Sequence, residues 1–133
     1  MNPFDEEDVR LLGTPLTRQV LGCAMAVHQE LGPGLLENAF RTALVRELQL
    51  AGLHALPEVA LGMSYKGVEI DCGYRADILV EQKLRLELKS VERVLPIHQA
   101  QLLTYLRVAK LRVGLIINFN AIHLRQGLKR LVV

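Results

Sequence analysis

The apolar positions of residues 14–31 repeat at the spacing of an α-helix. Thr14 can cap the N-terminus of this helix, and Pro15 suits its first turn. One continuous apolar face is formed by Leu16, Val20, Ala24, Val27 and Leu31. We therefore predict a helix over 14–31 that ends at the turn-forming sequence Gly32-Pro33-Gly34.

Two further stretches have helical spacing. The first covers about residues 35–51, before Gly52, and its apolar stripe is Leu36, Phe40, Ala43, Leu44, Leu48 and Ala51. The second begins at Pro96 and continues to about residue 109, with apolar positions at Ile97, Leu102, Leu103 and Leu106. Each stripe predicts a helix that packs one face against a core.

Between these helices the pattern alternates with the period of two that is typical of β-strands. The predicted strands are 56–64, 65–71, 74–80 and 84–90, with turn residues between them. Residues 113–117 are wholly apolar, as expected of a strand covered on both faces. One or two short strands are expected in the tail, around 121–125 and 128–133. The order of elements predicts one α/β (α+β-like) domain over residues 1–133, with helices flanking a mixed central sheet and a flexible segment at 1–13.

The strand pair 74–80 and 84–90 brings polar residues together. If the hairpin is centred on Gln82, its alternating apolar residues all point to one side of the sheet. The same register places Asp77 directly opposite Glu87 on the other side, with Lys89 two residues along that face. A slip of one residue would put the carboxylates in the core, so burial fixes this register.

Two carboxylates at cross-strand distance repel each other unless a cation lies between them. Oxygen ligands of this kind suit Mg²⁺ or Mn²⁺. We predict that Asp77 and Glu87 hold the metal with the backbone carbonyl of Leu88, while Lys89 orients or deprotonates a water. The alternative is a solvated strand face on which Glu87 and Lys89 form a weak ion pair.

Composition excludes several classes of protein. The chain has 133 residues, half of them apolar, which is enough for a buried core. It contains no run of eighteen apolar residues, and its acidic start does not have the pattern of a secretory signal. Cys23 and Cys72 have no CxxC spacing, so we expect buried free thiols in a reducing cytoplasm.

Charge is distributed unevenly along the sequence. Residues 1–82 hold 6 Lys and Arg against 12 Asp and Glu, and residues 83–133 hold 10 against 2, which gives −6 and +8. A basic half can attract a polyanion such as nucleic acid. The two halves can equally pack together and partly cancel.

A family resemblance makes the interpretation more specific. The segments that carry it are VHQELGPGLLENAF (27–40), YRADILV (74–80), LELKSVE (86–92), QLLTY (101–105) and VGLIINF (113–119). In order and spacing they resemble the small bacterial proteins of the GxxExxY family, within the PD-(D/E)XK nuclease-like superfamily. One departure is Phe40, where the naming motif ends in Tyr.

The resemblance implies a restriction-endonuclease-like core and a Mg²⁺- or Mn²⁺-dependent nuclease that hydrolyses phosphodiester bonds, with DNA preferred to RNA as substrate. Asp77, Glu87 and Lys89 would be its catalytic residues. The alternative from another class is a nucleic-acid-binding or protein-interaction module that retains the fold without turnover. Small nucleases often need a second subunit, so a homodimer is also expected.

The resemblance also suggests supporting residues. Glu37 would be an extra acidic ligand or a water-positioning group, or else a first-turn carboxylate paired with Arg41. Glu58 would be a further acid or a surface carboxylate. Gln101 and Tyr105, one helical turn apart, would support the site or touch DNA, or else form a simple surface pair.

His28 belongs to the family pattern but lies on or beside an apolar helix face. We expect it to be a hydrogen-bonded core residue rather than a ligand.

Overall fold

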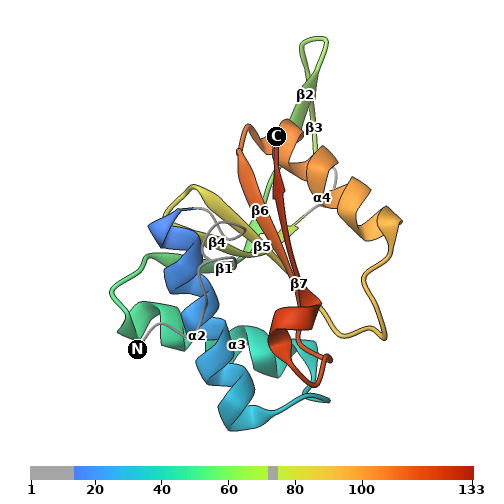
Figure 1. The fold of residues 1–133 in the computed structure, drawn as a ribbon. Coiled ribbons are helices and arrows are strands. Elements are labelled where there is room, and N and C mark those ends of the chain that lie inside the picture. The colour runs from blue at the N-terminus through green and yellow to red at the C-terminus, as the bar shows by residue number, and fades with distance from the viewer. Residues whose placement is uncertain (1–13, 72–74) are drawn as a thin grey trace.

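The computed structural model describes residues 14–71 and 75–133 (Figure 1). The helices are α2 (Pro15–Leu31), α3 (Glu37–Leu50) and α4 (Pro96–Ala109), with a 3-10 turn η1 (Leu124–Gly127). The strands are β1 (Ala55–Ala60), β2 (Met63–Tyr65), β3 (Val68–Ile70), β4 (Arg75–Val80), β5 (Leu84–Lys89), β6 (Val113–Asn118) and β7 (Leu128–Val132). The predicted α/β class with a mixed sheet flanked by helices is therefore confirmed.

Within the described residues, five strands form a mixed sheet in the order β1-β4-β5-β6-β7. Only the β5–β6 pair in this sheet is parallel, and α4 makes the crossover between these two strands. The short strands β2 and β3 form a separate hairpin, which projects from the body in Figure 1. Because β5 and β6 are parallel, their C-terminal ends lie side by side at the same end of the sheet.

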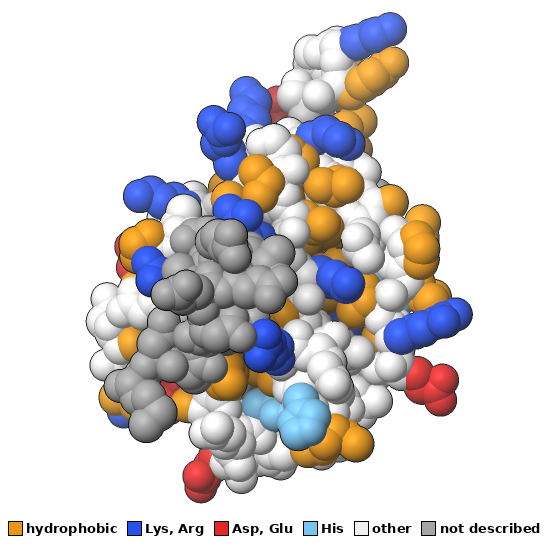
Figure 2. Space-filling view, in the orientation of Figure 1, with side chains coloured by type: hydrophobic (Ala, Val, Ile, Leu, Met, Phe, Trp, Pro, Cys, Tyr) orange, Lys and Arg blue, Asp and Glu red, His pale blue; other side chains and the backbone are white. Residues whose placement is uncertain are grey.

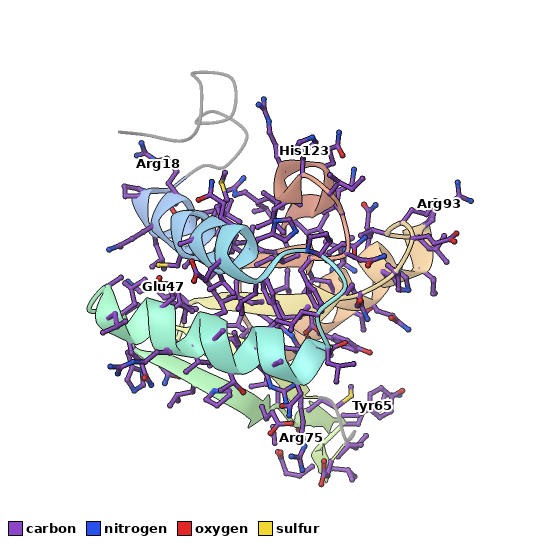
Figure 3. The ribbon with its side chains drawn as sticks, turned by 90° about the horizontal axis from the view of Figure 1, so that it is seen from below. Arg18, Glu47, Tyr65, Arg75, Arg93 and His123 are labelled. Atoms are coloured by element: carbon purple, nitrogen blue, oxygen red, sulfur yellow. The ribbon has the colours of Figure 1, made fainter. Side chains whose placement is uncertain are left out.

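The sheet has a helical layer on each face. Helices α2 and α3 cover one face together, and their apolar stripes join the main core (Figure 3). This core includes the alternating residues Ile78, Val80, Leu84, Leu86 and Leu88. On the other face, Leu102 and Leu106 of α4 pack around Ile116. The strand β6 is thus covered on both sides, as its wholly apolar sequence predicted.

The predicted boundaries hold for the helices and fail at three strands. Thr14 caps α2, and its side-chain oxygen accepts the N–H of Thr17 at 3.3 Å. The predicted strands 56–64 and 65–71 are both wrong as single elements. Strand β1 pairs with β4 only as far as Ala60, and a separate hairpin then pairs β2, which ends at Tyr65, with β3, which begins at Val68. The predicted strand 121–125 is also wrong, because the chain must reverse direction between β6 and β7 and forms η1 there.

Two smaller predictions concern the cysteines and the N-terminal segment. Cys23 is a free, half-buried thiol, while Cys72 and the segment 1–13 lie outside the described residues. Burial, followed by the charge of Glu47, raises the pKa of Cys23. None of the helices within residues 14–71 and 75–133 combines the length and the apolar character that a membrane span requires.

Candidate active site

Asp77 reaches across from β4 to β5. The observed register pairs Val80 with Leu84 and Ile78 with Leu86, as predicted, and continuing it places Asp77 next to Glu87. The backbone N–H of Leu88 donates to Asp77 Oδ2 at 2.7 Å. This hydrogen bond fixes the half-buried Asp77 carboxylate against the strand that carries Glu87.

Glu87 is buried and has a partner that the sequence analysis missed. Its residue is 9% exposed, and Arg85 Nε lies 2.5 Å from Glu87 Oε1. The guanidinium of Arg85 lies over the ring of Tyr105, 4.6 Å from its centroid. The alternative of a solvated strand face with a Glu87–Lys89 pair is therefore wrong for Glu87, because α4 covers this face and Arg85 is the salt-bridge partner.

The environment of Glu87 shifts its carboxyl toward the neutral form. The pKa of Glu87 is raised to about 7, first by burial and then by the charge of Asp77, although Arg85 and Lys89 act to lower it. Desolvation thus outweighs the attraction of a guanidinium in direct contact. A carboxyl whose pKa lies near neutrality inside a cluster of charged groups is a candidate functional group.

Glu37 stands at the first position of α3, where the helix dipole favours a carboxylate. Its pKa is raised by partial burial and by Asp77, and it is lowered by Lys89 and Arg41. Glu37 is therefore near enough to Asp77 and Lys89 for their charges to change its pKa. The alternative of a Glu37–Arg41 pair is not what forms, since Arg41 Nη2 donates to Asn38 Oδ1 at 2.6 Å.

Glu58 is an exposed carboxylate on the edge strand β1. Its neighbours Pro57 and Val59 pair with Ile78 and Ala76, so it lies alongside Asp77 in the sheet. The side chain is 55% exposed and forms an ion pair with Arg41 Nη2 at 3.3 Å. This arrangement agrees with the interpretation of Glu58 as a surface carboxylate.

The two α4 residues have different surroundings. Tyr105 is half-buried and contacts Arg85, so it reaches the site through that side chain. Gln101 is exposed, and among the described contacts none ties it to Asp77, Glu87 or Lys89. The structure therefore joins Tyr105, but not Gln101, to the cluster.

The end of β5 is held by a corner that the sequence analysis also missed. Buried Asn118, opposite Lys89 in the β5–β6 pair, donates from Nδ2 to the carbonyl of Val91 at 2.9 Å. Its Oδ1 accepts the N–H of Val91 at 3.1 Å. The N–H of Phe119 donates to the carbonyl of Lys89 at 3.1 Å. These bonds fix the backbone that carries Lys89.

His28 is a core residue, as expected. It is 7% exposed, and its Nε2 lies 3.1 Å from the carbonyl oxygen of Phe119 and 2.9 Å from that of Ala121. Both neighbours are acceptors, so Nε2 carries the proton. A hollow beside it, between α2 and η1, has a lining that includes His123 and Arg125 but not Asp77, Glu87 or Lys89. His28 thus ties α2 to the chain after β6.

The carboxylate oxygens of this site are chemically suited to a divalent cation, but they are too few to form a complete set of ligands. Among residues 14–71 and 75–133, no group of three or more His, Cys, Asp or Glu side chains is arranged to hold a metal ion. The hydrogen bonds described above use one oxygen of Asp77 and one oxygen of Glu87. Each carboxylate therefore has its second oxygen for a hard cation, and a backbone carbonyl or water would have to complete the set.

The fold and this cluster define a class of protein. It is an α/β protein with a mixed sheet, and its Asp-Glu-Lys cluster lies on the antiparallel strands β4 and β5, next to the parallel β5–β6 pair. A family model described as the PD-(D/E)XK nuclease superfamily matches residues 14–131. The chain belongs to this superfamily. The match does not separate the GxxExxY family from the rest of it. No curated protein and no solved structure matches the sequence significantly.

Proposed function

We propose that this protein is a metal-dependent nuclease that hydrolyses phosphodiester bonds, with DNA as the preferred substrate and Mg²⁺ or Mn²⁺ as the cofactor. The observation that carries the proposal is the side-chain cluster on β4 and β5. Asp77 is hydrogen-bonded to the backbone beside buried Glu87, and Lys89 follows on the same face. Membership in the superfamily supports the same activity.

In this proposal, each group has a separate task. Asp77 and Glu87 would hold the cation with their second oxygens, together with the carbonyl of Leu88. The bound metal would supply charge neutralisation and polarise the phosphate. Lys89 would orient the attacking water and offset phosphate charge, while Glu37 would interact electrostatically with Asp77 and Lys89. The Asn118 corner keeps the Lys89 backbone in place.

A cleavage assay tests this function. Purified wild-type protein with Mn²⁺ or Mg²⁺ should cut single- or double-stranded DNA, and Lys89→Ala should reduce the rate by about 10²- to 10⁴-fold. Lys83→Ala removes an exposed lysine from the turn just before β5, at the end of that strand away from Lys89, and should leave the rate unchanged. If wild type cuts no DNA or RNA faster than Lys89→Ala does, the proposal is wrong.

A second candidate is a non-catalytic module that binds nucleic acid or a protein. It is favoured by the lack of a complete ligand set in the described residues and by the elevated pKa of Glu87, since neutral Glu87 is a poor ligand. Titration calorimetry with Mn²⁺ separates the two functions. Saturable binding to wild type but not to Asp77→Ala/Glu87→Ala supports the nuclease, whereas nucleic-acid binding without metal binding supports the module.

Four narrower proposals accompany this function. The family assignment follows from the resemblance, and the others follow from chain length, the cysteine pattern and the need of small nucleases for a second subunit. The chain would be a GxxExxY protein, fold as one domain, act in the cytoplasm and form a symmetric dimer. Strand β7 is an edge of the sheet with Val132 48% exposed, so one surface for a second copy exists there. A monomeric mass by light scattering would count against the dimer.

A further inference from the structure

Arg85 is buried more completely than a guanidinium usually is. Its residue is 1% exposed, and it is among the largest fully buried side chains of the described chain. In the sheet it lies between Leu79 on β4 and Gly114 on β6, and Tyr105 of α4 covers its guanidinium. Gly114 lets α4 approach closely, because a Cβ there would lie 2.9 Å from a Leu102 side-chain carbon.

Fold stability does not account for this placement. Desolvating a guanidinium and a carboxylate is costly, and buried ion pairs can often be replaced by apolar residues without loss of stability. One nitrogen, Arg85 Nη2, is also buried without a hydrogen-bond partner in the described structure. A buried donor that makes no bond adds to the cost. The burial of Arg85 is therefore explained better by its effect on the Glu87 side chain.

The contact geometry shows what that effect is. Arg85 Nε approaches only Oε1 of Glu87, at 2.5 Å, and the stack on Tyr105 restrains the guanidinium from the other side. A carboxylate held by one oxygen cannot rotate freely, and its second oxygen is turned to a fixed direction. Protein metal sites often use such outer partners to orient the ligands themselves.

We propose that Arg85 is a positioning residue that acts through Glu87, holding Oε1 so that Oε2 is presented to a divalent cation, and that Tyr105 in turn holds Arg85. This inference rests on the proposed metal-dependent function. It assigns Tyr105 to the support of a ligand rather than to contact with nucleic acid.

Mn²⁺ affinity, measured by calorimetry, is the main test. Arg85→Gln should weaken Mn²⁺ binding by about 10- to 100-fold, the usual effect of removing an outer-shell partner. The matched control is Arg130→Gln, since Arg130 is a half-buried arginine of the same sheet that also has a buried nitrogen without a partner. That variant should bind Mn²⁺ as wild type does. Wild-type affinity in Arg85→Gln would overturn the proposal, as would tighter binding, which would mean that Arg85 competes with the metal.

A double-variant cycle distinguishes positioning from general support of the fold. If Arg85 acts through Glu87, Arg85→Gln should weaken Mn²⁺ binding no further once Glu87→Gln is present. If the two substitutions lower the Mn²⁺ affinity independently, so that their fold-changes multiply in the double variant, the proposal is overturned. The apo proteins should also be compared by circular dichroism, so that a loss of metal binding is not confused with a loss of folded structure.

Tyr105 provides a variant that leaves the ion pair in place. Tyr105→Leu should weaken Mn²⁺ binding more than Tyr105→Phe does, because phenylalanine keeps a ring over the guanidinium. If Arg85→Gln does not fold, this pair decides, and equal affinity of the Leu and Phe variants would overturn the proposal. Failure of wild type itself to bind Mn²⁺ would instead contradict the proposed metal-dependent function.

Discussion

At the scale of single residues, Glu87 should make the stability of the protein depend on pH. Its pKa in the folded protein is about 7, against an ordinary value of 4.5. Between these values the folded protein holds a proton that the unfolded chain has lost, so stability falls as pH rises from about 4.5 to 7. The contribution of this group is at most about 3 kcal/mol. Urea unfolding of metal-free protein at pH 5 and pH 8 measures it.

Substitution of Glu87 isolates this contribution. Glu87→Gln keeps the size of the side chain and cannot ionise, so its stability should fall less between pH 5 and pH 8 than that of wild type. Glu92→Gln, at an exposed position just after β5, should keep the wild-type dependence. Equal losses in wild type and Glu87→Gln would show that another group is responsible.

At the scale of elements, alternation and helical spacing predicted most of the fold. The β4–β5 register followed from the sequence because only one alignment buries Ile78 with Leu86 and keeps Asp77 out of the core. The same alternation places Arg85 on the face of Glu87, and this was the available signal for the buried pair. The pattern could not show that α4 covers that face, since a helix stripe does not specify the sheet surface on which it packs.

The irregular elements were harder to predict for a different reason. The end of β1 and the turn η1 depend on where long-range pairing stops, which local spacing does not determine. The Asn118 corner likewise depends on a side-chain amide bonding to the backbone of Val91, far along the sequence. These features position Lys89, so part of the candidate site lay outside what the pattern could predict.

The Asn118 corner requires a glycine at position 127. A Cβ on Gly127 would lie 2.2 Å from the carbonyl oxygen of Asn118, too close for any real contact. Gly127→Ala should therefore lower the free energy of unfolding by about 1–3 kcal/mol, as overpacking typically does. It should also weaken the Val91 contacts and reduce any activity that needs Lys89. Denaturant unfolding and the cleavage assay measure the two effects.

The control for this change is Gly22→Ala in α2. Position 22 has nothing within 4 Å of a built Cβ, and alanine is favoured over glycine within a helix. This variant should gain up to about 1 kcal/mol. If Gly127→Ala is as stable as Gly22→Ala, the close approach at Asn118 does not constrain the fold.

At the scale of the whole molecule, the sequence halves of opposite charge are folded together, yet the charge is not evenly mixed. Lys and Arg side chains outnumber Asp and Glu over the surface around β6, β7 and α4 in Figure 2. These elements all belong to the C-terminal half, whose net charge is +8. Packing of the two halves therefore does not hide the positive charge on this side, which favours a polyanionic partner.

Such a partner should bind with a steep dependence on salt. Lys89→Ala in the presence of a chelator allows DNA binding to be followed by fluorescence anisotropy without cleavage. If six to ten phosphates are contacted, affinity should fall by about 10³- to 10⁵-fold between 50 and 200 mM salt, because bound counterions are released. Lys129→Ala, at an exposed position on β7, should make the slope shallower if β7 faces the DNA. Binding that is insensitive to salt would contradict recognition of the phosphate backbone, and a protein would then be the better candidate partner.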